Sequence, residues 1–200
     1  MDWSAEWANL WQQLGARPPL GGLPQLLQAY AEPHRHYHTE RHLQACLLDL
    51  RRWSAEATHP QEVALALWFH DAVYDPVRHD NEVQSVQLLQ HMLAGRLDDT
   101  LLSRVANLIL ATCHQHAPAN GDTALLLDVD LAILGAEPVA FAEYERQVRA
   151  EYAWVAEEVY QQTRRGLMQR WLVAPRIYHT PSAGALEQAA RRNLQHWWGQ

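Results

Sequence analysis

Lysine is absent from this chain of 200 residues, so its 16 basic residues are all arginines. The absence excludes the chemistries that need a lysine, including a P-loop phosphate site, a Schiff base and a lysine general base. Acidic residues outnumber basic residues by 23 to 16, which gives a formal net charge of −7. Proteins that bind the phosphate backbone of nucleic acids normally carry a basic surface. The composition therefore argues against a nucleic-acid polymer as a partner.

Cysteine is scarce, and long apolar runs are missing. Cys46 and Cys113 are too few for a disulfide framework, and their apolar helical surroundings are typical of small core residues. The longest apolar run has about the length of residues 63–69, well short of the roughly 20 residues that span a bilayer. The first six residues are acidic and lack the order of a secretion signal. We therefore expect a cytoplasmic protein that makes no contact with a membrane.

Histidine, by contrast, is abundant, with 12 copies in the chain. Four of them, His34, His36, His38 and His42, lie within nine residues. Neutral imidazole binds transition metals, and it titrates near physiological pH. The irregular pattern of residues 32–38 predicts a loop. Because three of the four histidines lie in it, this loop is a candidate part of a functional site.

Apolar residues recur at spacings of three and four along nearly the whole chain, which is the period of an α-helix, and no hairpin signal interrupts them. The predicted fold class is therefore all-α. No repeat, low-complexity tract or linker divides the chain, so we expect a single domain over residues 1–200. Helices are predicted at residues 4–14, 24–31, 39–55, 60–71, 81–94, 99–112, 122–134 and 182–197, with one bent helix or two over residues 138–172.

The dipeptide His70-Asp71 ends the helix predicted from Pro60, whose inward face is otherwise apolar. A charged aspartate at such a place must be paired or must hold a cation. For an isolated pair of this kind, a helix cap is the alternative. His70 and Asp71 therefore indicate a metal site only together with further donor residues on other helices.

Asp130 and His42 are two such donors beside apolar stripes. The residues three and four positions from Asp130 are leucines and one isoleucine, and a carboxylate in that setting marks an ion pair or a metal. His42 lies at the edge of the core stripe of helix 39–55, where an isolated histidine is more often a core residue. Asp128 has the less apolar flank, and we interpret it as a helix-surface charge, with a carboxylate that supports the metal ligands as the alternative.

Donors on separate helices can converge in a helical bundle. His42, His70, Asp71 and Asp130 would form a mixed set of nitrogen and oxygen ligands. Such a set suits manganese, iron, cobalt, nickel or magnesium better than a thiolate-preferring ion. Four ligands leave two positions of an octahedral ion open, one for water and one for a substrate oxygen, which is typical of metal-assisted hydrolysis.

In chain order these four residues resemble the H…HD…D signature of the HD-domain superfamily of metal-dependent phosphohydrolases. Flanking segments are similar to one branch, the small predicted HD phosphohydrolases; they are residues 36–43, 68–76, 81–82, 111–112, 127–135, 149–152, 177–178 and 190–191. The similarity extends from about residue 29 to residue 194. It implies a helical bundle with a metal-binding core over about residues 29–135 and C-terminal helices over about 138–197. It also implies a divalent ion held by His42, His70, Asp71 and Asp130.

Two further residues are candidates for catalysis. Glu82 begins the helix predicted at 81–94 and could accept a proton from the attacking water. A glutamate in a first turn also stabilises the helix dipole, which is the alternative explanation. His114 follows the helix that ends near residue 112 and could reach a phosphate or a second metal, as histidines of related HD proteins do; His116 is the weaker candidate.

Three residues are candidates for substrate binding. His38 lies four positions before His42, so the two rings share a face if a helical turn begins between them, and a solvent-facing loop residue is the alternative. Arg149 and Tyr152 lie three positions apart on one side of the long C-terminal helical segment. Without lysine, an anionic substrate depends on arginine, histidine, backbone amides or the metal, so Arg149 is a candidate phosphate ligand. An intrahelical pair with Glu145 is the alternative.

We therefore expect a divalent-metal phosphohydrolase that acts on a small phosphorylated molecule, with nucleotides as the first candidates. Two alternatives stay open. One is an HD-fold module that binds a metal or nucleotide as a sensor without turnover, and the other is a helical bundle in which the same residues form buried hydrogen-bonded pairs. The sequence identifies neither the phosphate ester nor the number of chains that assemble.

Overall fold

The structure is a computed structural model, and it describes residues 1–198 apart from the side chain of residue 198. The described residues form helices and loops with no strand among them, so the predicted all-α class is confirmed. Positions 199 and 200 of the predicted domain lie outside the described residues. In chain order the α-helices and the 3₁₀ helices are α1 (Trp3–Gln13), α2 (Gly22–Tyr30), α3 (Glu40–Trp53), η1 (Ser54–Glu56), α4 (Pro60–Phe69), α5 (Asn81–Leu93), α6 (Asp99–Ala111), α7 (Gly121–Asp130), η2 (Leu131–Gly135), α8 (Pro138–Glu151), α9 (Glu157–Val173), α10 (Pro181–Gly184) and α11 (Glu187–Trp198).

The predicted helices agree with the observed ones over most of the chain, and the larger differences lie after residue 121. The segment predicted as one helix over 122–134 is α-helical only as far as Asp130 and continues as η2. The segment 138–172 forms two helices, α8 and α9. The last predicted helix is divided into α10 and α11.

Arg149 closes the turn between α8 and α9. Its guanidinium donates hydrogen bonds to the backbone carbonyls of Tyr152 (2.6 Å) and Val155 (3.1 Å), and its Nε lies 2.8 Å from a carboxylate oxygen of Glu157. These bonds hold carbonyls of the turn that begins at the C-cap of α8 and ends before α9. Because residues 152–156 contain no glycine or proline, the sequence pattern alone could not place this turn.

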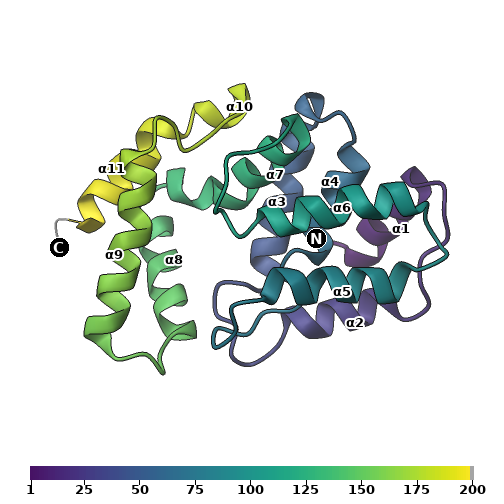
Figure 1. Cartoon of the computed structure of the whole chain (residues 1–200), viewed down its shortest axis with the longest axis horizontal. Coiled ribbons are helices and arrows are strands. Elements are labelled where there is room, and N and C mark those ends of the chain that lie inside the picture. The colour runs from purple at the N-terminus through teal and green to yellow at the C-terminus, as the bar shows by residue number, and fades with distance from the viewer. Residues whose placement is uncertain (199–200) are drawn as a thin grey trace.

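One cluster of buried apolar side chains joins the N-terminal and C-terminal helices, and it includes Trp11, Leu67, Val105, Met168 and Leu194. Figure 1 shows α8, α9 and α11 at one side of the molecule and α1, α2, α5 and α6 at the other. Between these two groups, α3, α4 and α7 pack against one another. Among the described helices, none combines the length and the apolar character that a bilayer span needs.

Two local features set the positions of the predicted ligands. The hydroxyl of Thr39 accepts a hydrogen bond from the backbone N–H of Arg41 (3.3 Å), which starts α3 and places His42 in its first turn. The buried guanidinium of Arg35 donates to the backbone carbonyl of Asp71 (2.6 Å), just beyond the end of α4. The loop before α3 is therefore tied to the segment that follows α4.

A buried ion pair holds α9 on α8. Arg164 Nε lies 3.1 Å from Glu145 Oε2, and Nη2 of the same guanidinium donates to the hydroxyl of Tyr144 (2.6 Å). Both charged side chains are only 8% exposed. Removing one partner of such a pair leaves the other charge buried without compensation.

We predict that Arg164→Ala lowers the free energy of unfolding by about 3–5 kcal/mol, because the Glu145 carboxylate would remain buried and unpaired. Arg146→Ala removes an exposed pair with Glu143 on the same helix and should change stability little. Denaturant unfolding of both variants makes the comparison. Equal losses of stability in the two variants would contradict this account of the α8–α9 contact.

Candidate metal centre

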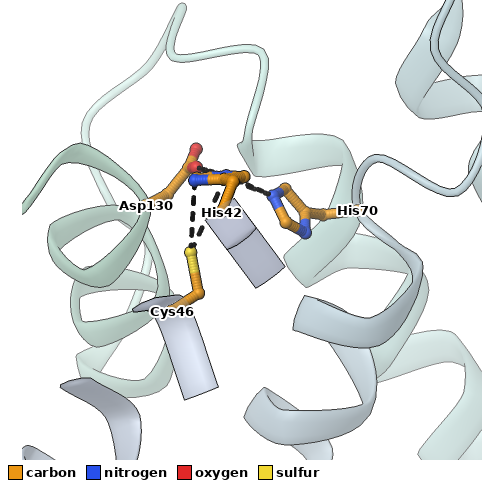
Figure 2. Close-up of side chains that lie close together, drawn as sticks. All are labelled: His42, Cys46, His70 and Asp130. Carbon is orange, nitrogen blue, oxygen red and sulfur yellow. Dashed lines mark hydrogen bonds and ion pairs between the residues drawn. The ribbon is translucent and has the colours of Figure 1, made fainter. Parts of the chain in front are cut away.

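The four predicted ligands meet at the ends of three helices. His42 lies in the first turn of α3, His70 and Asp71 follow α4 directly, and Asp130 ends α7. His42 Nε2 lies 3.1 Å from His70 Nε2 and 3.1 Å from Asp130 Oδ1. Asp71 Oδ2 lies 3.0 Å from His70 Nε2 and 3.6 Å from His42 Nε2. In Figure 2, the His42 ring lies between Asp130 and His70.

These separations match those of donor atoms around one metal ion. Two donors at right angles on an ion with bonds of about 2.1 Å are about 3.0 Å apart, and two donors in tetrahedral positions are about 3.4 Å apart. Five pairwise distances among the four donor atoms run from 3.0 to 3.6 Å. The spacing is therefore compatible with a single ion shared by all four side chains.

A hydrogen bond at Nδ1 of His70 leaves Nε2 of the neutral ring available to bind a cation. Nδ1 lies 2.8 Å from the backbone carbonyl of Leu67, so Nδ1 carries a proton and donates it to this bond. In the neutral ring, Nε2 then holds a lone pair that faces Nε2 of His42. Metal-ligating histidines almost always donate their other N–H in this way. A cation between the two rings would satisfy both nitrogens at once.

One carboxylate oxygen of Asp71 lacks a hydrogen-bond partner among the described residues. Its Oδ2 is buried and forms no hydrogen bond of acceptable geometry within residues 1–198, although His70 Nε2 is only 3.0 Å away. A buried charged oxygen without such a bond is costly. A cation here would remove that cost, and two imidazoles with two carboxylates suit divalent transition ions or magnesium. The residues present therefore fit a divalent ion.

Cys46 belongs to the same buried group, although the sequence pattern indicated only a core position. His42, Cys46, His70 and Asp130 each offer one ligand atom, these atoms lie within 4.8 Å of one another, and the group could bind a metal ion. Cys46 Sγ is 3.7 Å from both ring nitrogens of His42, so it is equidistant from them and does not lie on the Nε2 side of the ring. An ion bonded to Nε2 would lie beyond the ring, about 3 Å or more from this sulfur, whereas a Zn–S bond is about 2.3 Å. The signal for Cys46 was its position one helical turn after His42.

Burial and opposite charges compete within this group. Burial acts to lower the pKa of His70, but Asp71 and Asp130 outweigh it and raise this pKa well above its usual value. Burial acts to raise the pKa values of the two aspartates, but the surrounding histidines hold both below the usual range. Burial, reinforced by the same aspartates, raises the pKa of Cys46. The group therefore offers anionic oxygens and a neutral thiol, and a cation that bound at Nε2 of His70 would displace the proton that this raised pKa favours.

His114 contacts a predicted ligand. Its Nε2 lies 2.8 Å from Asp130 Oδ2, while Oδ1 of the same carboxylate faces His42. The residue has a φ of 52°, a left-handed conformation that is uncommon outside glycine and clusters at functional sites. This contact orients Asp130, and the predicted catalytic role of His114 stays a prediction.

The interpretation of Asp128 as a surface charge is wrong. The residue is 1% exposed, and its carboxylate accepts hydrogen bonds of 2.6–2.9 Å from the backbone N–H groups of His179 and Thr180 and from the Thr180 hydroxyl. Asp128 thus anchors the segment before α10. We expected a solvent-facing side on this helix, but α7 is buried around its whole circumference from residue 123 to residue 129. A charge at position 128 therefore has no solvent face on which to lie.

A cavity of about 430 Å³ lies beside the ligand group. Its walls include two predicted ligands and four of the other predicted site residues, namely Asp71, Asp130, His38, Glu82, His114 and Tyr152. Glu82 is partly buried and forms no hydrogen bond or ion pair with the part of the chain that the structure describes. Its carboxylate is therefore free to act on a molecule in the cavity.

The structure does not bring Arg149 to this cavity, because its guanidinium closes the α8–α9 turn. Its ion-pair partner is Glu157, whereas Glu145, the predicted alternative, pairs with Arg164. Of the described arginines, Arg78 and Arg164 line the cavity. Both already have carboxylate partners, so an anion in the cavity depends mainly on histidines and a bound ion.

Sequence reasoning missed Glu151, the last residue of α8. Its Oε1 accepts hydrogen bonds from the backbone N–H groups of His36 (2.8 Å), Tyr37 (2.8 Å) and His38 (3.0 Å). The histidine-rich loop therefore owes its shape to a carboxylate more than 110 positions away. In the sequence, Glu151 lies in segment 149–152, which resembles the HD branch, but Arg149 and Tyr152 were the candidates chosen from it because Glu151 looks like one more charge on an amphipathic helix.

Comparison with known proteins yields no relative. No family model matches the chain, and neither a curated protein nor a solved structure matches it. The case for the site therefore stands on the geometry above, and the HD phosphohydrolase resemblance remains an expectation from the sequence.

We predict that His114→Ala weakens the binding of a divalent ion about 10- to 100-fold, because Asp130 loses the hydrogen bond that orients it. His116→Ala, which alters an exposed histidine two positions away, serves as the matched control. Calorimetric titration of metal-free protein with Mn²⁺ measures both affinities. If the two variants bind Mn²⁺ equally well, His114 does not support the site.

Proposed function

We propose that this protein is a divalent-metal phosphohydrolase with an HD-type helical fold, and that it acts on a small phosphorylated molecule, with nucleotides as the first candidates. One observation carries the proposal: two imidazole nitrogens and two carboxylate oxygens converge at 3.0–3.6 Å beside a cavity. Their order along the chain, H…HD…D, supports the same assignment. Manganese, iron, cobalt, nickel and magnesium are the candidate ions.

The donor group opens toward the cavity on its carboxylate side. His42 and His70 are buried, with exposures of 5% and 2%, whereas Asp71 and Asp130 contribute to the cavity wall. A divalent ion held by these four residues would lower the pKa of a bound water and neutralise charge on a phosphoryl group. The histidines thus anchor the ion from the core, and the aspartates bring it to the substrate side.

Other residues of the cavity wall supply the remaining functions. Glu82 has a free carboxylate, which can accept a proton from the attacking water. The rings of Tyr152 and Trp171 provide aromatic surface of the kind on which a nucleobase packs. A volume of about 430 Å³ lies within the range of small-molecule sites. These features favour a phosphorylated metabolite over a polymer.

We predict that Asp71→Asn abolishes both stoichiometric metal binding and metal-dependent hydrolysis of phosphomonoesters and nucleotides, because the variant loses an anionic ligand. Asp122→Asn is the matched control, since Asp122 lies at the other end of α7 and binds the backbone N–H groups of Thr58 and His59. Elemental analysis and a substrate panel with each candidate ion measure the two properties.

Three outcomes distinguish the alternatives. Metal loss and activity loss in Asp71→Asn, with both retained in Asp122→Asn, would support the proposal. Stoichiometric metal in the parent protein without turnover on the whole panel would favour a non-catalytic binding or sensor module. A parent protein that takes up no metal under reconstituting conditions would contradict the proposal altogether.

We also predict that metal at 100 times its Kd raises the free energy of unfolding by about 2.7 kcal/mol, because the ion binds only the folded site. Excess chelator should reverse the gain, and Asp71→Asn should show no gain. Thermal unfolding with and without Mn²⁺ makes the measurement. An unchanged melting temperature would favour a plain bundle in which these side chains form buried pairs.

A further inference from the structure

Glu151 is a buried carboxylate, and three of its four hydrogen-bond partners, Tyr37, His38 and Tyr74, line the cavity. Its side chain is fully buried, and its Oε1 is occupied by three backbone N–H groups of the loop before α3. The second oxygen, Oε2, accepts from His38 Nδ1 (2.7 Å) and from the Tyr74 hydroxyl (2.9 Å). Burying a carboxylate requires such compensation, and here hydrogen bonds to one loop and two rings provide it.

These contacts fix the His38 ring. Nδ1 is held by Glu151, and the ring stacks on Tyr74 with a centroid distance of 4.1 Å and an interplanar angle of 26°. Nε2 forms no hydrogen bond within residues 1–198. The ring is part of the cavity wall, together with Asp71 and Asp130. One nitrogen is therefore committed to the scaffold, and the other remains for a ligand.

The role of His38 differs from that of the four metal ligands. Five distances among the donor atoms of those ligands are 3.0–3.6 Å, whereas the ion-pair partner of the His38 ring within residues 1–198 is Glu151. Its ring centroid lies 5.8 Å from that of His42, so the two rings are neighbours rather than members of one coordination shell. A molecule held at Asp71 and Asp130 through an ion would share the cavity with His38, because all three residues line it.

We infer that Glu151 is a positioning residue that holds His38 so that its Nε2 hydrogen-bonds to the phosphoryl group of a molecule bound at the ion. This inference rests on the proposed function and adds to it the residue pair that recognises the phosphoryl group. Orientation by a carboxylate on the far nitrogen is a general way of fixing which ring nitrogen faces a ligand. Tyr74 supports the same geometry, because it contacts both Glu151 and the face of the His38 ring.

The probes are Mn²⁺ and inorganic phosphate. For the intact chain, we expect His38→Ala to weaken the binding of phosphate to the Mn²⁺-loaded protein about tenfold or more, because one hydrogen bond to a charged group is lost. The affinity for Mn²⁺ itself should change less than about twofold, since His38 is not a ligand. Calorimetric titration gives both constants, and circular dichroism verifies that the variants fold.

Glu151→Gln tests the positioning role. The amide oxygen of glutamine can still accept from the backbone N–H groups of the loop, but its NH₂ group faces His38 Nδ1, where an acceptor is needed. We expect phosphate binding to weaken nearly as much as in His38→Ala, and we expect the double variant to be no weaker than His38→Ala alone. With isotope-labelled histidine and Mg²⁺, the Nε2 resonance of His38 should shift when phosphate is added, and Glu151→Gln should abolish that shift.

Glu187→Gln is the matched control, because Glu187 also accepts loop N–H groups, those of Ile177 and Tyr178, but lies outside the cavity wall. It should leave phosphate binding unchanged. Phosphate affinity within twofold of the parent in His38→Ala, additive losses in the double variant, or equal losses of Mn²⁺ and phosphate affinity would each overturn the inference while the proposed function stands. A parent protein that binds Mn²⁺ but no phosphate also overturns it, and one that binds no divalent ion overturns the proposed function and this inference together.

Discussion

Two buried imidazoles and two partly buried carboxylates at the junction of α3, α4 and α7 are the constraint that organises the surrounding structure. Charged groups lose several kcal/mol on leaving water unless they find partners. Two of the side-chain atoms that face away from the centre have protein partners: His70 Nδ1 contacts the carbonyl of Leu67, and Asp130 Oδ2 contacts His114. The atoms that face inward instead point at one another. A cation at this junction would satisfy all of them, and the loops around the site hold the donors in place.

Arginine serves mainly as scaffold in this lysine-free chain. Arg35 ties the loop before α3 to the end of α4, Arg149 closes the α8–α9 turn, and Arg164 joins α8 to α9. The planar guanidinium can satisfy several acceptors at once, which suits it to these positions. Because these arginines are used in this way, recognition of the proposed anionic substrate would depend on histidine and on a bound ion. His38, fixed by Glu151, is well placed for that task.

Buried carboxylates complement this scaffold by holding loops through backbone N–H groups. Asp128 anchors the segment before α10, and Glu151 anchors the loop that carries His38. Asp128 lies on α7, which carries Asp130, and the loop held by Glu151 leads into α3, which carries His42, so both carboxylates act on helices that carry predicted ligands. A single helix-surface charge and a loop anchor look alike in a sequence, because the difference lies in what packs against the residue.

Helical periodicity predicted the site residues whose positions are set by the helix on which they lie. His42, His70 and Asp130 interrupt apolar stripes, and polar residues in such positions require partners wherever the helices lie. The same reasoning underestimated Cys46, which resembles an ordinary core residue, and it misjudged Asp128, whose helix has no exposed face. It also made Arg149 a candidate phosphate ligand, because no sequence pattern marks an arginine that hydrogen-bonds to the carbonyls of a turn.

By itself, the sequence determined the helical class, the approximate position of nearly every helix and the donor residues at the helix ends, because these follow from spacing within a single helix. Only the tertiary structure decided where the C-terminal helices break, that Asp128 of α7 is buried, and that Glu151 shapes the loop of His38. Each of these depends on a contact between distant segments, such as the bond from His36 to Glu151 across 115 positions. Local periodicity carries no information about which distant group will complete such a bond.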